Sequence, residues 1–190
     1  MGTGLIVSLV ILGVVVLTVL WAISAYNGLV ALREQVRTGW AQIDVLLKRR
    51  YDLIPNLVEA VKGYASHEKE TLDRVISARN AATSVAPGNT AGAIAADNQL
   101  SGSLRQLFAV AEAYPDLKAN QNFLQLQNEL SNTENQVAGA RGGYNQTVRS
   151  YNTSIMSFPT NLFAAPFGFN TQPFFEVQDA GQRDAPKVKF

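Results

Sequence analysis

The strongest constraint on the fold is a run of 19 uncharged residues near the start of the chain, residues 5–23. Sixteen of them are apolar. As a helix, the run would extend about 28 Å, close to the thickness of about 30 Å of a bilayer's hydrocarbon core. Trp21 and Tyr26 lie where aromatic side chains commonly meet the membrane interface. The sequence therefore predicts a short leader (residues 1–4) and a transmembrane anchor (residues 5–25).

A cleaved signal peptide is the alternative interpretation of this run. Two features favour the anchor: residues 1–4 carry no Lys or Arg, and the run is longer than the apolar core of about 7–15 residues in a signal peptide. No second run of this length follows, so the anchor is expected to cross the membrane once. Arg33 and Arg37 lie after the anchor and no basic residue lies before it, so the positive-inside rule predicts a cytoplasmic C-terminal domain.

The composition excludes several kinds of functional site. Sixteen Lys and Arg against 15 Asp and Glu give a net charge of +1, which is not the basic field of a nucleic-acid-binding protein. The absence of cysteine and the single histidine, His67, exclude thiolate catalysis and multi-histidine metal sites. Asp44, Asp52 and Glu59 have basic residues nearby in sequence as simpler partners than a metal ion. We therefore predict no enzymatic activity, no cofactor, no small-molecule substrate and no nucleic-acid partner.

Residues 26–157 carry apolar residues at helical spacing, which predicts a helical domain. The first series continues the anchor helix to about residue 50 in steps of three or four; it comprises Leu29, Leu32, Val36, Trp40, Ile43 and Leu47. A second helix is expected to start at Asp52, as the N-cap, with Pro55 in its first turn. The Ala-Pro-Gly-Asn segment at residues 86–89 ends that helix, and Thr90 is a candidate cap for a third.

The predicted fourth helix, residues 117–156, has the longest apolar seam in the chain. Its members are spaced by three, four or seven residues, as in a coiled coil: Phe123, Leu126, Leu130, Val137, Ala140, Tyr144, Val148, Tyr151 and Ile155. Short connections between four long helices predict an antiparallel, up-and-down bundle. The predicted fold class is therefore all-α: one N-terminal transmembrane helix that continues into a four-helix bundle. The last helix would return the chain to the membrane.

A basic triplet, Lys48, Arg49 and Arg50, is a candidate distal basic cluster on the first helix. Along a straight helix, residue 50 lies about 39 Å beyond residue 24, too far to bind the lipid headgroups that flank the anchor. Two interpretations are open for the triplet: favourable charge at a helix C-terminus, or a site for an anion or a partner protein.

The tail, residues 158–190, is irregular and rich in phenylalanine and proline. Six of the chain's nine phenylalanines lie between residues 158 and 175. Each buried phenylalanine contributes about 1.5–3 kcal/mol, so this segment is not expected to stay solvated. It either plugs the end of its own bundle, contacts the membrane interface or docks onto a neighbouring subunit. The candidate contact residues are Phe158, Leu162, Phe163, Phe167, Phe169, Phe174 and Phe175.

Charged and amide residues are distributed unevenly. Residues 24–82 carry 16 charged side chains in 59 positions, whereas residues 90–157 carry nine in 68. Of the 26 Asn and Gln residues, 21 lie from Asn89 onward. Amide-rich faces are soluble but cost less to bury than charged ones. Either the composition simply drifts, or the third and fourth helices and the tail form the surface that meets other subunits.

Several motifs, in order along nearly the whole chain, resemble the LemA family. They include Tyr26-Asn27-Gly28-Leu29, the run from Trp40 to Arg50, Asp52-Leu53-Ile54-Pro55-Asn56, Ala111-Glu112-Ala113-Tyr114-Pro115, Phe123-Leu124-Gln125, Phe158-Pro159-Thr160-Asn161 and Ala185-Pro186-Lys187-Val188-Lys189-Phe190. The segment Arg141-Gly142-Gly143-Tyr144 departs from the family pattern. Each of its two glycines weakens a helix by about 1 kcal/mol relative to alanine.

The resemblance implies a bacterial, single-pass protein of the plasma (inner) membrane with a helical-bundle domain and no established enzymatic activity. Relatives include a protein of magnetosome membranes, and family genes often neighbour a membrane zinc metalloprotease. We therefore predict an oligomeric scaffold in membrane organisation or remodelling, whose partners are the lipid bilayer and other copies of itself. The alternative is an adaptor or regulator of another membrane protein, such as a membrane-bound protease in quality control.

Overall fold

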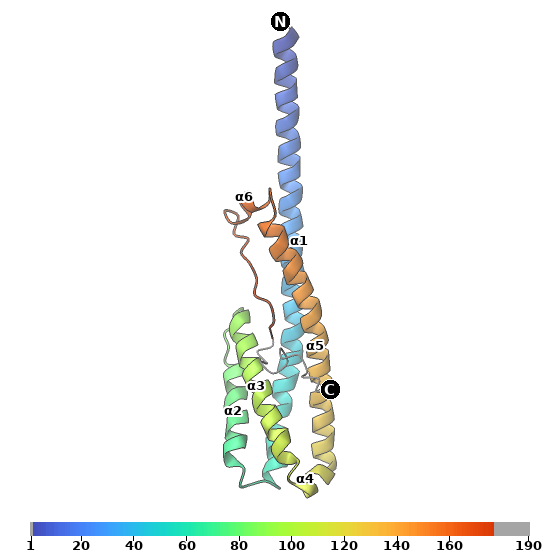
Figure 1. The fold of residues 1–190 in the computed structure, drawn as a ribbon, viewed down its shortest axis with the longest axis vertical. Helices are drawn as coiled ribbons and strands as arrows, with labels where there is room; N and C mark the ends of the chain where they lie inside the picture. Colours follow the sequence, from blue (N-terminus) through green and yellow to red (C-terminus); the bar gives the residue numbers. More distant parts are fainter. Residues whose placement is uncertain (1, 177–190) are drawn as a thin grey trace, which may run out of the picture. The chain divides into compact units, whose positions relative to one another are not determined.

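The computed structural model of the chain describes residues 2–176, and every regular element in that range is a helix (Figure 1). In chain order the helices are α1 (Gly2–Lys62), α2 (Lys69–Thr83), α3 (Thr90–Ala111), α4 (Pro115–Ala119), α5 (Gln121–Met156) and α6 (Asn161–Ala164). The predicted all-α class is therefore confirmed. The polar end of the predicted tail, residues 177–190, lies outside the described residues.

The described chain forms two compact units, and α1 and α5 each contribute to both. We call residues 2–39 with residues 143–174 the tail unit, and residues 40–142 with residues 175–176 the bundle unit. In the bundle unit, α1, α2, α3 and α5 run alternately in opposite directions (Figure 1). This arrangement confirms the predicted antiparallel four-helix bundle.

The core of the bundle unit consists of the apolar residues that recur at helical spacing. Each of its helices buries one stripe, and the buried side chains include Ile43, Leu47, Ile54, Leu57 and Val61 of α1, Leu72 and Val75 of α2, Leu100, Leu104 and Leu107 of α3, and Phe123, Leu130 and Val137 of α5. Burial of a side chain of this size contributes about 1.5–3 kcal/mol, so the stripes account for the association of the helices.

Helix α1 does not end near residue 50, so the predicted start of a second helix at Asp52 is wrong. The helix continues through Pro55 to Lys62, and the next helix begins only at Lys69. Pro55 has no N–H to donate to the carbonyl of Tyr51, four residues earlier. In the fold, Nε of Arg79 on α2 donates to that carbonyl at 3.4 Å. A residue from a neighbouring helix thus compensates for the proline.

The starts of α3 and α5 also differ by a few residues from the prediction. Asn89, rather than Thr90, caps α3, and its Oδ1 accepts a hydrogen bond of 2.9 Å from the backbone N–H of Gly92. The predicted fourth helix is interrupted at Asn120, whose backbone is extended. The Asn120 side chain accepts a hydrogen bond of 3.0 Å from the N–H of Phe123, so it caps the long helix α5.

In the tail unit, the first part of α1 is a bare apolar helix. Residues 5–20 are exposed, and α1 is the described helix that is long and apolar enough to cross a membrane. Farther along, α1 packs against the end of α5 through a small core, which comprises Leu29, Val36, Tyr144, Val148, Tyr151 and Ile155. The tail and its short helix α6 follow α5.

Candidate functional site

Aromatic side chains of the tail pack on α1 at the end of its exposed apolar stretch. The ring of Phe163 meets that of Trp21 edge to face, with 5.9 Å between centroids. Phe167 and Phe169 meet Tyr26 in the same way, at 5.6 and 5.4 Å. We call these five residues the aromatic cluster. Edge-to-face pairs contribute about 0.5–1.5 kcal/mol beyond the area that they bury, so they help to keep the tail beside α1.

Hydrogen bonds from α5 position the following part of the tail. The Asn152 side chain donates to the carbonyl of Gln172 and accepts from the backbone N–H of Gln172, both at 2.9 Å. The hydroxyl of Tyr144 donates to the carbonyl of Pro173 at 3.0 Å. Burial raises the pKa of Tyr144 to about 12, so this hydroxyl keeps its proton at neutral pH. The tail therefore has a defined path along α5.

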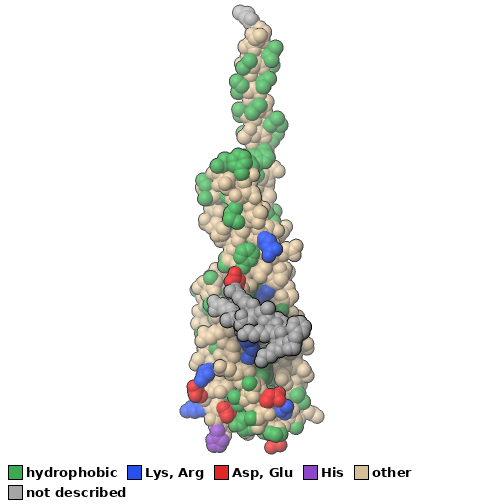
Figure 2. Space-filling model, viewed as in Figure 1, with side chains coloured by type: hydrophobic (Ala, Val, Ile, Leu, Met, Phe, Trp, Pro, Cys, Tyr) green, Lys and Arg blue, Asp and Glu red, His purple; other side chains and the backbone are tan. Residues whose placement is uncertain are grey.

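Four apolar side chains of the tail unit are largely exposed, and one of them, Phe167, also belongs to the aromatic cluster. Met156, Phe158, Leu162 and Phe167 are between 62% and 80% exposed, and we call them the apolar patch. Figure 2 shows hydrophobic side chains along the free stretch of α1 and on the tail at its base. Exposed apolar surface of this kind marks a membrane or protein contact. The patch therefore continues the apolar surface of the predicted anchor.

The predicted contact residues of the tail occupy two kinds of position. Phe169 and Phe175 are buried, at 2% and 3% exposure, and Phe163 is half-buried, whereas Phe158, Leu162, Phe167 and Phe174 are exposed. Arg33 of α1 places its guanidinium 5.1 Å from the centre of the Phe169 ring. Trp21 and Tyr26 remain 40% and 39% exposed. One set of phenylalanines thus fills the fold, and the other is available to the membrane or to a neighbour.

The basic triplet does not form a single surface. Lys48 and Arg49 are exposed, and Lys48 pairs with Asp52 at 3.7 Å. Arg50 points into the bundle unit and is only 4% exposed. Consecutive residues of a helix point in directions about 100° apart, which separates Arg50 from its two neighbours.

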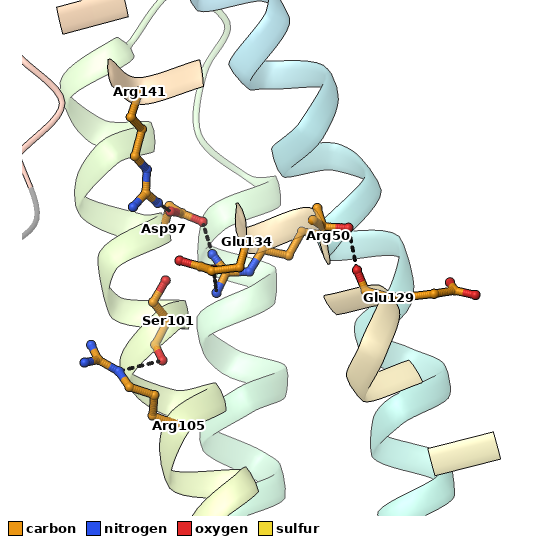
Figure 3. Close-up of polar contacts among 8 residues, drawn as sticks. Arg50, Asp97, Ser101, Arg105, Glu129, Glu134 and Arg141 are labelled. Carbon is orange, nitrogen blue, oxygen red and sulfur yellow. Dashed lines mark hydrogen bonds and ion pairs between the residues drawn. The ribbon is translucent and has the colours of Figure 1, made fainter. Parts of the chain in front are cut away.

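Arg50 belongs to a buried ion-pair network that the sequence analysis missed. Its centre is Asp97 of α3, which is fully buried. Nη1 of Arg50 donates to Oδ1 of Asp97 at 3.0 Å, and Nη2 of Arg141 on α5 donates to Oδ2 at 2.5 Å. Nη2 of Arg50 also pairs with Glu134 of α5 at 2.8 Å. The network connects α1, α3 and α5, as Figure 3 shows.

Burial and the two arginines have opposite effects on the pKa of Asp97. Burial raises the pKa of Asp97, and the guanidinium groups of Arg50 and Arg141 oppose that rise. Two guanidinium partners satisfy both carboxylate oxygens, as a buried carboxylate requires. Arg141 also lies over the ring of Phe175, 4.2 Å from its centre. The sequence signal was the position of Asp97 within the apolar series of Ile94, Leu100 and Leu104.

A groove of about 980 Å³ lies between α3 and α5 in the bundle unit, next to this network. Arg50, Glu134 and Arg141 line it together with Ser101 and Arg105 of α3. Amide side chains also line it, namely those of Asn98, Gln99, Gln127 and Asn135. The amide-rich part of the sequence therefore contributes the walls of the groove. Within residues 2–176, no three His, Cys, Asp or Glu side chains are placed to bind a metal ion.

An exposed apolar helix of membrane-spanning length, joined to a helical bundle, defines a membrane-associated helical protein. The family model of the LemA family matches residues 39–190. The chain belongs to the LemA family.

Curated proteins of this family and of magnetosomes are similar in sequence. Protein LemA of Metamycoplasma hominis is 25% identical over 124 residues, which cover 65% of this chain and 56% of that protein. Magnetosome protein MamQ 2 of Paramagnetospirillum magneticum is 23% identical over 99% of this chain and 78% of that protein. Magnetosome protein MamQ of Magnetospirillum gryphiswaldense is 21% identical over 86% of this chain and 68% of its own length.

Proposed function

We propose that this protein is a non-enzymatic, oligomeric scaffold of the bacterial plasma membrane, with its bundle on the cytoplasmic side. The observation that carries the proposal is the apolar patch beside the exposed apolar stretch of α1. Parallel insertion into one membrane would present the patches of neighbouring copies at the same depth. Burial of Phe158, Leu162 and Phe167 between copies would then stabilise an assembly by about 1.5–3 kcal/mol for each side chain.

The contacts that hold the tail in place support this role. Asn152 and Tyr144 position its backbone, and the aromatic cluster places Phe167 beside Tyr26. A contact surface that is already ordered loses less conformational entropy on association than a flexible one. The similarity to magnetosome proteins supports a role in a specialised bacterial structure.

The test is the size of the full-length protein in mild detergent, measured by sedimentation. We expect a defined homo-oligomer in the wild type and a smaller species in the triple variant Phe158→Asn, Leu162→Asn, Phe167→Asn. These three positions are exposed, so the substitutions leave the buried Phe169 and Phe175 in place. Val45→Asn is the matched control, since Val45 is a 68% exposed apolar residue of the bundle unit.

A monodisperse wild-type monomer, or an unchanged oligomer in the triple variant, would contradict the scaffold proposal. Crosslinking in native membranes then addresses the alternative function, an adaptor for another membrane protein such as a protease. Recovery of a different protein in stoichiometric amount would favour the adaptor, whereas self-crosslinks through the patch would support the scaffold.

A further inference from the structure

The tail unit carries few charged side chains, and most of them are positive. Residues 2–39 contain Arg33, Glu34 and Arg37, and residues 143–174 add only Arg149. Glu34 is therefore the one acidic residue of this unit, and it pairs with Arg37 at 3.1 Å. Neither Arg33 nor Arg149 forms an ion pair with a carboxylate of residues 2–176. The unit that contains the predicted anchor thus has positive charge that no described carboxylate neutralises.

The ring of Phe169 places Arg33 close to the predicted membrane interface. Its centroid lies 5.4 Å from that of Tyr26, the aromatic residue expected at the interface. The guanidinium carbon of Arg33 lies 5.1 Å from the centre of the same ring. Phe169 is only 2% exposed, so the ring is fixed by its neighbours. Arg33 is therefore held near Tyr26, although seven positions separate the two residues along α1.

The direction and depth of Arg33 bring its charge within range of lipid headgroups. Side chains of a helix lean toward its N-terminus, and on α1 that end is the predicted anchor. Along the helix, residue 33 lies about 14 Å beyond residue 24. Headgroups occupy roughly the first 5–8 Å of that distance, and the remainder is about one Debye length at physiological salt. The guanidinium of Arg33 can therefore interact with a charged membrane surface.

We propose that the tail unit binds the headgroups of anionic lipids, with Arg33 as the principal contact. Arg149 adds a second charge: it is exposed on α5, next to Val148 in the core shared with α1. The phosphate oxygens of the headgroups accept hydrogen bonds from these guanidinium groups. The inference rests on the membrane insertion that the proposed function includes, and it adds the kind of lipid. Neither arginine belongs to the apolar patch, so contacts between copies and lipid binding use different residues.

The test is quenching of Trp21 fluorescence in the full-length protein, reconstituted into vesicles with brominated lipids. Trp21 is 40% exposed, and Trp40 lies about 28 Å farther along α1, beyond the reach of brominated chains. Brominated phosphatidylglycerol and brominated phosphatidylcholine, each mixed with unbrominated phosphatidylcholine, give the relative association constant of the anionic lipid. We expect phosphatidylglycerol to be favoured about fivefold at low ionic strength. The preference should fall toward one in 1 M salt, because salt screens the attraction.

Two substitutions on adjacent residues should change the preference in opposite directions. Arg33→Gln should lower it about threefold, whereas Arg33→Lys keeps the charge and should retain most of it. Glu34→Gln releases Arg37 from its ion pair and should raise the preference about twofold. Glu34 is exposed, and loss of folding cannot produce this gain, so the variant remains informative if Arg33→Gln disturbs the tail. Arg49→Gln is the matched control: it removes the same charge from an exposed position about 24 Å farther along α1.

Equal quenching by the two brominated lipids would overturn the proposal while leaving membrane insertion intact. A preference that Arg33→Gln and Glu34→Gln do not change would place the headgroups elsewhere and would also overturn it. An equal loss in Arg49→Gln would assign the effect to net charge rather than to the tail unit. Absence of quenching by either lipid would contradict membrane insertion itself, and with it the scaffold. Oligomer size enters none of these readouts, so failure of this proposal can be distinguished from failure of the scaffold.

Discussion

Asp97 connects α3 to α1 through a hydrogen bond of 3.0 Å from Nη1 of Arg50, and neither side chain is more than 4% exposed. Its second carboxylate oxygen accepts from Arg141 of α5. One aspartate is therefore the common partner of two buried arginines that lie 91 positions apart in the sequence. Any change at Asp97 affects three of the bundle's helices together.

Substitution of Asp97 by alanine should strongly destabilise the bundle. Asp97→Ala leaves Arg50 and Arg141 buried without their shared carboxylate, and breaking a buried ion pair on one side costs about 3–5 kcal/mol. Urea unfolding of the full-length protein, followed by circular dichroism, measures the free energy of unfolding. Asp73→Ala, at an exposed position on α2, should change it by less than about 0.5 kcal/mol. Equal effects of the two substitutions would show that the network contributes little to stability.

Replacement of Pro55 should make Arg79 less important. In Pro55→Ala the new N–H can donate to the Tyr51 carbonyl, which in the wild type accepts from Nε of Arg79. Arg79→Ala should therefore cost about 1 kcal/mol of unfolding free energy in the wild type and markedly less in the Pro55→Ala background. A double-mutant cycle measures this coupling. Strict additivity of the two substitutions would contradict the proposed compensation.

Phe169 should be required for the position of the tail. It is 2% exposed and contacts both Tyr26 and Arg33. Phe169→Ala should cost about 3–5 kcal/mol, enough to release the tail from α1. Hydrogen exchange of the amides around Gln172 reports the release. Phe167→Ala provides the comparison, because Phe167 is 62% exposed, and it should leave these amides much better protected than Phe169→Ala does.

The protein should lose stability at alkaline pH through its buried tyrosines. Burial raises the pKa of Tyr144 to about 12 and also raises the pKa of Tyr51 and Tyr151. A phenol in the unfolded chain titrates near pH 10, so the folded state holds these protons more tightly. The stabilising contribution is complete below about pH 10 and is lost as the pH rises toward about 12. Melting temperatures across this range, with phenolate absorbance, measure the effect. Folded-state titration of every tyrosine near pH 10 would contradict it.

The predicted orientation can be tested because the native chain has no cysteine. Ser77→Cys places a thiol on an exposed position of α2, and Thr3→Cys places one before the apolar stretch. With the bundle in the cytoplasm, a membrane-impermeant maleimide should label Thr3→Cys in intact spheroplasts, and should label Ser77→Cys only after lysis. The reverse pattern would place the bundle outside the plasma membrane.

The bundle could be predicted from the sequence because the spacing of apolar residues along each helix is a local pattern. Stripes such as Ile43 and Leu47 on α1, or Leu130 and Val137 on α5, follow directly from helical spacing and are buried as expected. The boundary at Pro55 could not be predicted in this way. A local rule places a proline in the first turn of a helix, whereas the residue that compensates for it, Arg79, lies 24 positions later.

The candidate site could be predicted from the sequence only in part. Asp97 interrupts an apolar series of α3, and Arg50 lies between Leu47 and Ile54 on the buried stripe of α1, so the burial of both charges could have been noticed. Their pairing could not, since contacts across 47 positions depend on how the helices pack. Nε of Arg50 and Nε of Arg141 have no hydrogen-bond partner, because the carboxylates bind the terminal guanidinium nitrogens. No sequence pattern encodes that choice.

The hydrogen bond from Arg79 to the Tyr51 carbonyl also bears on how the bundle folds. In the last two and a half turns of α1, one backbone hydrogen bond is missing, because residue 55 of α1 has no N–H to donate to the Tyr51 carbonyl. Extension of α1 past Tyr51 is therefore coupled to the docking of α2, and the two segments should form as one cooperative folding unit. Because Pro55 weakens this part of α1 in isolation, we expect the α1–α2 hairpin, rather than the single helix, to be the smallest stable part of this region.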